Sequence, residues 1–325
     1  MTAVLSRDEI RRSNGERIQR LSSVSAKRII EPEIDLPGEV APGQILPDRL
    51  LSTNGSGIEL TPEQKAQLSR EEVASMFELG LRIEAILMAG FCMAVVTDDV
   101  TDPRSVYRLH EVGEETRHSR AFSRVIASIG PTVKHPIDRV PRFVVGLVTS
   151  LGAAVLLRFP LLFNMLVLTG EEIPDWFQAR AIEADGVDPF VKSVNRYHRQ
   201  EEARHISFAR VMIPELYKQT HFLDRLAVRL LLPFIAYFLG HAFVHPLVYR
   251  AVGLPPLRTW NRVRRSTPRV QGQRESIRPV LQALIDNGVI KAGRVPRAWR
   301  RVCGVNRRGE ALAPVYDWHT QPVAA

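Results

Sequence analysis

The chain has 325 residues, of which 45% are hydrophobic and 24% charged, and its formal net charge is +9. This composition excludes a disordered or fibrous chain and predicts a folded protein with a substantial core. Its two cysteines, Cys92 and Cys303, lie far apart, which excludes a disulfide framework and favours two buried thiols in a reducing cytosol.

The first predicted part, residues 1–60, begins with a polar segment that we expect to be helical over residues 6–30. No apolar stretch follows its charges, so we expect no signal peptide and a cytoplasmic protein. Residues 31–60 are rich in proline and glycine, which is typical of irregular chain that wraps a fold.

The second predicted part, residues 61–254, carries helical signals and no convincing strand pattern. Thr61 and Pro62 predict a helix start, because threonine caps helices and proline is tolerated at the first helical position. The pattern predicts helices at 62–68, 70–97, 103–129, 140–182, 188–217 and 222–249, with breaks at Pro131, at Pro160 or Pro174, and at Pro246.

The third predicted part, residues 255–325, is a basic extension with one short helix expected at 275–287. Between Arg258 and Arg308 it holds fourteen Lys and Arg against two acids, so the remainder of the chain is slightly acidic. This stretch has only Trp260 and Trp299 for stacking, so nucleic acid is not expected as a partner. We interpret the extension as a solvated or partner-facing segment.

Two long apolar runs carry no charge: Leu230–Tyr249 and Phe143–Leu157. The first could span a bilayer by length, but prolines and histidines interrupt it. We therefore favour buried helices, or the wall of a substrate channel, for both runs. The alternative is peripheral membrane contact, in which apolar surface beside the basic extension docks on anionic lipid.

The strongest signal is an internal repeat with an offset of 87 residues. Glu114-Glu115-Thr116-Arg117-His118 recurs as Glu201-Glu202-Ala203-Arg204-His205. Glu84 lies 31 residues before Glu115, and Glu171 lies 31 residues before Glu202. The pattern Glu-x30-Glu-x-x-His therefore occurs twice.

The spacing has a physical explanation. Residues three apart share a helical face, so each Glu-x-x-His presents a carboxylate and an imidazole together. A separation of 31 residues allows a helix, a turn and a return. One Glu-x-x-His on a helix usually marks a solvated face, but two copies with matched glutamates in apolar surroundings would be costly without a cation.

This arrangement is typical of two metal ions held inside a four-helix bundle. We predict an all-α fold with a ferritin-like four-helix bundle core, additional helices and the basic C-terminal segment. Carboxylate and imidazole ligands favour two iron ions, with manganese as the other candidate.

The repeat is not symmetric at one position. His198 lies four residues before Glu202, where the first copy has Glu111, and it offers a third imidazole. At another position two residues compete: the repeat spacing favours Glu171, whereas the apolar stripe favours Glu172. We choose Glu171, because Pro174 disturbs the helical phase on which the stripe depends. The seven predicted metal ligands are Glu84, Glu115, His118, Glu171, His198, Glu202 and His205.

With these residues the sequence resembles the di-iron oxygenase family of p-aminobenzoate N-oxygenase, whose members carry two Glu-x-x-His motifs and an additional histidine. Arg20–Arg28, Leu60–Ser69 and Asp185–Pro189 also resemble family segments, and the likeness covers about residues 15–215. The resemblance implies that the seven residues bind two irons. It also implies that Glu114 and Glu201 orient ligand histidines, although the family motif commonly has Asp there.

The resemblance further implies an enzyme that activates dioxygen to oxygenate a small organic substrate, most readily an amine nitrogen. C–H hydroxylation stays open, including of a membrane-associated substrate, and an external reductase or ferredoxin is expected to supply electrons. The rivals are a ferritin-like ferroxidase or iron store, and an interaction protein with structural metals. The sequence is compatible with a homodimer. We expect His110, His135, His221 and His319 to lie outside the site.

Overall fold

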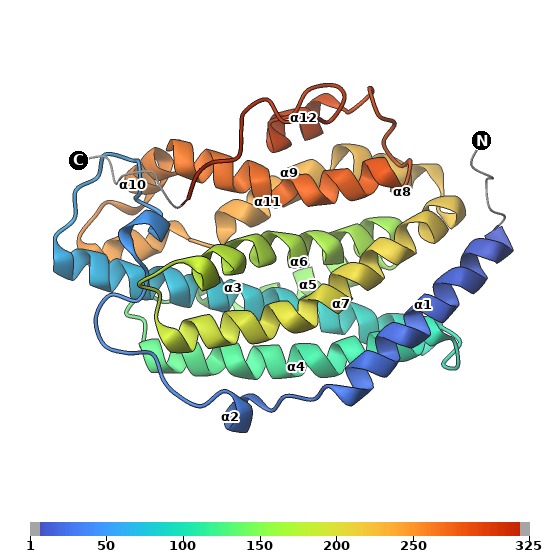
Figure 1. Cartoon of the computed structure of the whole chain (residues 1–325), viewed down its shortest axis with the longest axis horizontal. Coiled ribbons are helices and arrows are strands. Elements are labelled where there is room, and N and C mark those ends of the chain that lie inside the picture. The colour runs from blue at the N-terminus through green and yellow to red at the C-terminus, as the bar shows by residue number, and fades with distance from the viewer. Residues whose placement is uncertain (1–6, 319–325) are drawn as a thin grey trace.

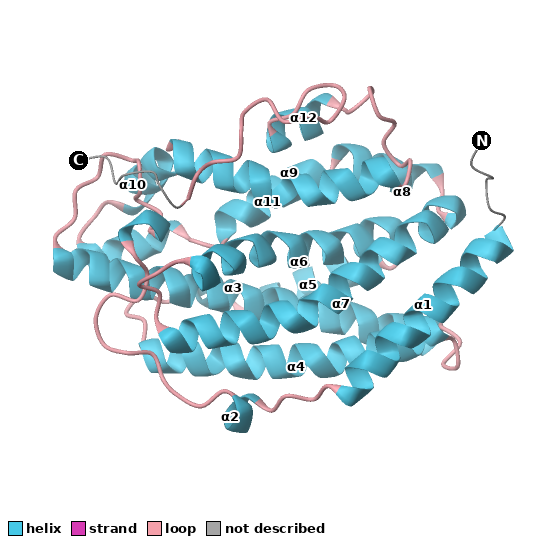
Figure 2. Cartoon of the chain, in the orientation of Figure 1, coloured by secondary structure: helices cyan, strands magenta, loops and turns pink. Residues whose placement is uncertain are grey.

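The computed structural model describes residues 7–318, and within them the chain is helical with no named strand (Figures 1 and 2). A single isolated bridge joins Val305 and Ala311. The all-α fold predicted from the sequence is confirmed. The α-helices are α1 Arg7–Lys27, α2 Pro32–Asp35, α3 Pro62–Thr97, α4 Pro103–Ile129, α5 Arg142–Leu156, α6 Pro160–Glu183, α7 Pro189–Gln219, α8 Phe222–Leu230, α9 Leu232–Ala242, α10 Pro256–Val263, α11 Thr267–Asp286 and α12 Arg297–Cys303.

Four long helices form the central bundle: α3 packs on α4, α6 packs on α7, and α4 meets α7 across the middle. Helix α1 crosses the outside of α4 and α7 (Figure 1). Caps set the helix starts. Thr61 and Gln64 form the capping box of α3, and the carboxylates of Asp102 and Asp188 accept backbone N–H bonds at the starts of α4 and α7.

One predicted boundary in the bundle is wrong. Residues 62–68 and 70–97 form one continuous helix, because Ser69 bonds its hydroxyl to a backbone carbonyl within the helix and does not interrupt it. Of the two alternative breaks expected within 140–182, the structure has the one at Pro160, which separates α5 from α6 with a bend of 119°. Pro174 stays inside α6, whose packing against α7 tolerates the missing backbone hydrogen bond.

The helix expected over 222–249 is divided at Leu231 into α8 and α9, which the sequence did not predict, whereas the expected break at Pro246 is confirmed by a 3-10 turn at Pro246–Val252. The chain turns at Leu231, where the next residue pair, Leu232 and Pro233, starts a new helix. Proline has no N–H to donate and therefore favours a new first turn over a continuing helix.

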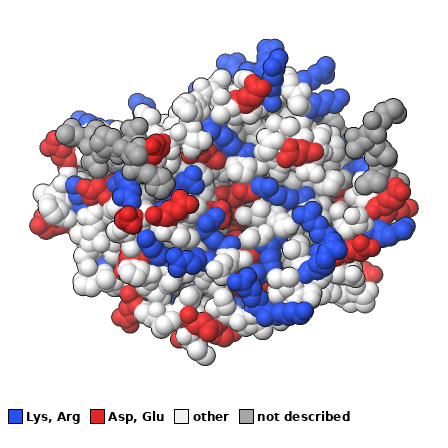
Figure 3. All heavy atoms as spheres, viewed as in Figure 1, with Lys and Arg blue, Asp and Glu red and all other residues white. Residues whose placement is uncertain are grey.

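The interpretation of the basic extension as a solvated segment is wrong. Helix α11 packs along α6 and runs from residue 267, not 275, and α12 follows it. Ile277, Val280 and Trp299 are buried in the same apolar cluster as the inner face of α6. Many of the arginines near α12 are exposed: Lys and Arg gather at the upper edge in Figure 3, where Figure 1 places α12.

Helix α5 was expected to be buried and is not. None of its residues is buried, and Phe143 keeps 77% of its surface exposed. Cys92, near the end of α3, is also exposed, whereas Cys303 is buried as expected. Two described helical stretches, Pro62–Thr97 and Leu232–Val252, are long and apolar enough to cross a membrane by length and composition, and α5 with α6 would make a third if the bent pair counts as one.

Candidate metal centre

The four bundle helices bring all seven predicted ligands together in the interior, each of them buried. Their ligand atoms form two groups within which every atom lies within 4.8 Å of the others. We call these group A and group B. Group A consists of Glu84, His118 and His198, and group B consists of Glu115, Glu171, Glu202 and His205.

Glu115 and Glu202 lie between the two groups. Oε2 of Glu115 is 3.1 Å from Nδ1 of His118, while its Oε1 is 3.3 Å from Nδ1 of His205. Glu202 does the same, with Oε1 3.1 Å from His118 and Oε2 2.9 Å from His205. Each carboxylate thus points one oxygen toward each group, which is the geometry needed to bridge two cations.

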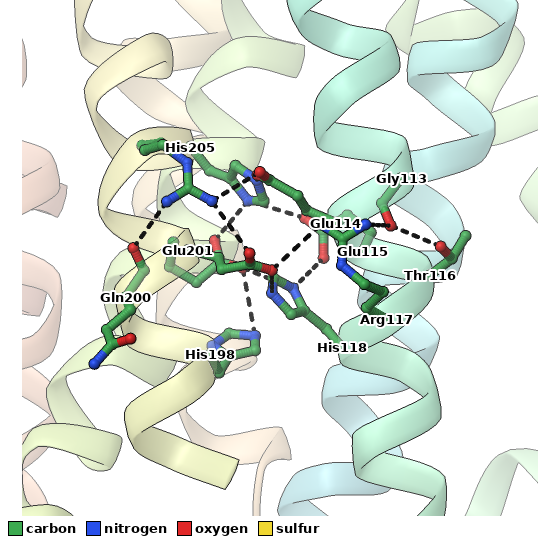
Figure 4. A network of polar contacts seen from close by, with 12 residues as sticks. Gly113, Glu114, Glu115, Thr116, Arg117, His118, His198, Gln200, Glu201 and His205 are labelled. Atoms are coloured by element: carbon green, nitrogen blue, oxygen red, sulfur yellow. Dashed lines mark hydrogen bonds and ion pairs between the residues drawn. The ribbon is translucent and has the colours of Figure 1, made fainter. Parts of the chain in front are cut away.

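The outer nitrogens of the two histidines are held crosswise (Figure 4). His118, on α4, donates from Nε2 to Glu201 on α7 at 3.1 Å. His205, on α7, donates from Nε2 to Glu114 on α4 at 2.8 Å. A proton fixed on Nε2 leaves Nδ1 of each ring directed at the bridging carboxylates. Glu114 and Glu201 therefore occupy the orienting positions that the family resemblance implied.

His198 is oriented by a residue that the sequence did not reveal. Its Nδ1 donates to the side-chain oxygen of Gln178 on α6 at 3.0 Å, and its Nε2 is 3.3 Å from Glu84. Phe122 stacks on the ring at 4.9 Å between centroids. The available signal was that Gln178 lies seven residues, or two turns, after Glu171.

Two arginines of the repeated motif were also missed as site residues. Arg204 contacts Glu114 at 2.7 Å and Glu201 at 3.3 Å, so one guanidinium joins the two orienting carboxylates. Its Nε also donates to Ser25 of α1. Arg117 lies 3.7 Å from Glu201. The signal was present, because both copies of the motif read Glu-Glu-x-Arg-His.

The charges in this interior shift the pKa values strongly. Burial opposes protonation of His118 and His205, yet the surrounding carboxylates raise the pKa of both well above the usual value. Burial would raise the pKa of Glu202, but His205 and His198 hold it well below its usual range. The pKa of Glu171 is raised well above normal, first by burial and then by Glu202 and Glu115. In the metal-free protein the imidazolium protons neutralise the carboxylates.

The residues fit a pair of metal ions. Oε1 of Glu115 and Oε1 of Glu202 are fully buried and accept no hydrogen bond; their near neighbours are the Nδ1 atoms of His205 and His118. Buried carboxylate oxygens that accept no hydrogen bond are costly, and a cation between the groups would satisfy both. Binding would displace the Nδ1 protons of the histidines. The set of imidazoles and carboxylates suits iron or manganese.

The alternative ligand Glu172 and three of the other histidines lie outside the two metal groups. Glu172 forms an ion pair with Arg210 instead of joining group B. His135 contacts the ring of His245, and His221 caps α8, so neither belongs to the two groups. His110 is absent from them as well among the described residues. His319 lies outside the described residues.

A cavity of about 120 Å³ adjoins the metal groups and reaches the three ligands Glu84, Glu171 and His198. Aromatic side chains from several helices line it, with Gln178 and Asn195 among the polar groups. The far wall comes from both ends of the chain. It is formed by Leu46, Arg49 and Ser52 of the N-terminal segment, and by Arg269, Gly272 and Trp318 of the C-terminal extension.

Comparisons with known proteins agree with this geometry. The sequence profile of the family described as "P-aminobenzoate N-oxygenase AurF" matches residues 11–288. The match extends past the expected limit at residue 215 and includes α11 of the basic extension. The N-oxygenase activity in this description is that of the family.

Among curated proteins, the chain is similar to Uncharacterized protein Mb0909 of Mycobacterium bovis, and to Uncharacterized proteins MT0908 and Rv0885 of Mycobacterium tuberculosis. Each is 29% identical over 185 residues, which is 57% of this chain and 53% of the relative. The chain thus spans about half the length of the curated relatives it matches.

Proposed function

The chain belongs to the p-aminobenzoate N-oxygenase family, and from this premise we propose that it is a di-iron oxygenase that transfers oxygen to an amine nitrogen of a small organic substrate. The observation that carries the proposal is the aromatic-lined cavity against Glu84, Glu171 and His198. A substrate held there would meet the metals from the side of group A. A ferroxidase or iron store needs no such organic cavity, so the cavity favours an oxygenase.

The protein residues would define the chemistry in three ways. Glu115 and Glu202 would hold the two ions close together, while Glu84 and Glu171 would bind one ion each. Glu201, Glu114 and Gln178 fix the proton positions of the three imidazoles. When bound, the two irons would supply the redox chemistry that activates dioxygen.

The cavity lining would govern what reacts. Phe77, Phe122 and Phe177 line the cavity and would exclude water around a flat apolar ring bound there. The side-chain oxygen of Gln178 accepts a hydrogen bond from His198, so Gln178 would orient this metal ligand. Hydroxylation of a C–H bond is the second candidate, because the same apolar lining would accept a hydrocarbon group. Electrons would come from an external reductase or ferredoxin, in a cytoplasmic setting.

The test is a single-turnover reaction of the reduced, iron-loaded protein with isotopically labelled dioxygen. Arylamines and matched arenes without the amino group are offered in parallel, and products are identified by mass spectrometry. We expect labelled oxygen on the nitrogen of an arylamine, and none with Glu202→Ala. Labelled alcohol from the arenes would favour C–H hydroxylation. Oxidation of many irons per chain with no labelled product would overturn the oxygenase and leave the ferroxidase.

A further inference from the structure

The internal repeat continues one position beyond the seven predicted ligands. The offset of 87 residues relates α3 to α6 and α4 to α7, and it maps Glu84 onto Glu171 and His118 onto His205. It also maps Glu111 of α4 onto His198 of α7. Glu111 is therefore the counterpart of the third histidine.

Two of three related positions follow this correspondence in space. Group A takes its terminal residues from three helices: Glu84 from α3, His118 from α4 and His198 from α7. The equivalent three on group B would come from α6, α7 and α4. The first two are Glu171 and His205, which belong to group B. The third position falls on Glu111.

Glu111 is a buried carboxyl group without a partner. It is 0% exposed, and neither of its oxygens makes a hydrogen bond. The charged groups that act on it are His205, Glu115, Glu202 and Glu114, which are members of group B or contact it. The two arginines nearby are already paired, Arg204 with Glu114 and Glu201, and Arg117 with Glu201.

Other buried acids in the bundle do not share this isolation. Glu72 is 0% exposed as well, but its carboxylate accepts from the backbone and hydroxyl of Ser52. Glu71 accepts from Thr132. A buried polar group without partners is costly, so a cation bound beside Glu111 would stabilise the carboxylate.

We propose that Glu111 is an eighth metal ligand, which binds the ion of group B at the place that His198 holds on the ion of group A. The inference rests on the proposed two-metal site. It makes the two ions chemically unequal, because one has a neutral imidazole where the other has an anionic carboxylate. The carboxylate of Glu111 would then stabilise a higher positive charge on the ion of group B than the imidazole of His198 does on the ion of group A.

The experiment titrates metal-free protein with Co²⁺ and follows both heat and the visible absorption of the bound ion. Wild type should show two binding events. Glu111→Leu should weaken one of them by at least about ten-fold, while the other keeps its affinity. The same variant, without metal, should unfold at higher urea concentration than wild type, because an unpaired buried carboxyl group has been replaced by an apolar side chain of similar size.

Two further variants make the result specific. Glu111→His should restore the weakened event with an altered Co²⁺ spectrum, as expected for an imidazole in a ligand position. Glu111→Gln keeps the shape of the side chain and tests the loss of the ligand if the leucine variant does not fold. Glu72→Gln is the matched control, a buried carboxylate away from both groups, and should leave both binding events unchanged.

Two binding events of wild-type affinity in Glu111→Leu and in Glu111→Gln would overturn the eighth ligand and leave the two-metal site standing. Fewer than two events in wild type would instead count against the two-metal site itself. The two failures are therefore distinguishable.

Discussion

The imidazoles of His118 and His205 each contact carboxylates on opposite sides of the ring. The inner nitrogen faces the bridging pair, Glu115 and Glu202, and the outer nitrogen is bound by a glutamate of the opposite repeat. The ring orientation is therefore fixed before metal arrives. The same two outer glutamates meet at one guanidinium, that of Arg204, which ties both orientations to a single residue.

Arg204→Met should accordingly damage both stability and metal binding. The variant leaves Glu114 and Glu201 buried without their shared cation, which we expect to lower the free energy of unfolding by roughly 3 kcal/mol. Metal affinity should fall about 10- to 100-fold, because the orienting carboxylates lose their position. Urea unfolding and metal titration measure the two effects.

The matched control is Arg199→Met on the same helix. Arg199 pairs with Asp175 at a partly exposed position, with 35% of its side chain accessible, and its loss should cost about 0–1 kcal/mol. Equal destabilisation by the two substitutions would contradict the role given to Arg204.

His198→Ala should leave two metals bound. Glu84 and His118 remain in group A, and the bridging carboxylates Glu115 and Glu202 are untouched. The reaction of the reduced protein with dioxygen should change, because one ion loses a neutral donor and opens a position. Metal content by elemental analysis and rapid-mixing absorption measure this. Unchanged kinetics of the reaction with dioxygen would show that His198 is only a buried helix histidine.

The ligands of the metal centre were predictable from the sequence where they belong to the repeated motif. The repeat places Glu84, Glu115 and His118 in one half by spacing alone, because helical periodicity and an antiparallel return fix their relation. Gln178 was missed. Its position two turns after Glu171 places it on the same face of α6, but its contact with His198 joins α6 to α7, and the sequence of one helix does not reveal that contact.

At the scale of whole helices, the approach of α3 to α6 depends on a glycine. A Cβ on Gly90 would lie 2.4 Å from the ring of Phe163, closer than any real contact. The aromatic ring of Phe163 also packs edge-on against Phe91, so a shift of the ring would disturb that contact as well. These two helices carry Glu84 and Glu171, and their separation therefore depends on the missing side chain.

Gly90→Ala should destabilise the protein by about 1–3 kcal/mol through overpacking, despite the better helix propensity of alanine. Gly146→Ala on α5 is the control, since nothing lies within 4 Å of the added methyl group and alanine should stabilise by roughly 0.5–1 kcal/mol. Thermal unfolding of both variants tests the contrast. If Gly90→Ala were more stable than wild type, the distance between α3 and α6 would not depend on the missing side chain.

Helix existence was predictable, and helix ends less so. Caps and prolines placed the starts of α3, α4 and α7, because these act within one turn of chain. The break at Pro160 and the continuity through Pro174 were not separable from sequence, since the surrounding packing decides whether a helix survives a proline. Burial of α11 was hidden by its arginines, which are half-buried beside a face of the helix that is apolar.

For the molecule as a whole, the most unusual feature is an apolar surface along the end of α3 and the length of α5. We call it the α3–α5 surface. Monomers rarely expose contiguous apolar patches above a few hundred Å². Each of its eight large side chains is between 40% and 82% exposed: Ile86, Met93, Val96, Phe143, Leu147, Val148, Leu151 and Val155.

We expect a second copy of the chain to cover this surface. The chain segments that flank its helices carry charges of both signs, with Asp98 and Asp99 after α3 and Arg139 and Arg142 before α5. Charges of both signs beside an apolar centre are typical of a protein interface, and a two-fold axis lets one strip pair with itself. An anionic membrane would favour a rim of positive charge alone.

Light scattering should therefore give twice the chain mass, and the double variant Leu147→Glu with Leu151→Glu should give a monomer that still binds metal. Because both leucines are exposed and away from the metal groups, the fold should tolerate the change. A wild-type monomer that sediments with anionic lipid vesicles would assign the surface to a membrane instead.

The crosswise pairing of histidine and glutamate has a consequence for the origin of the centre. Neither helical hairpin, α3–α4 or α6–α7, can orient its own imidazole, because the glutamate that does so lies on the other hairpin. A lone ancestral hairpin could have built the same arrangement only by pairing with its twin, and such a pair would have been strictly symmetric. In a single chain the two positions related by the repeat can differ, as histidine at 198 and glutamate at 111 do.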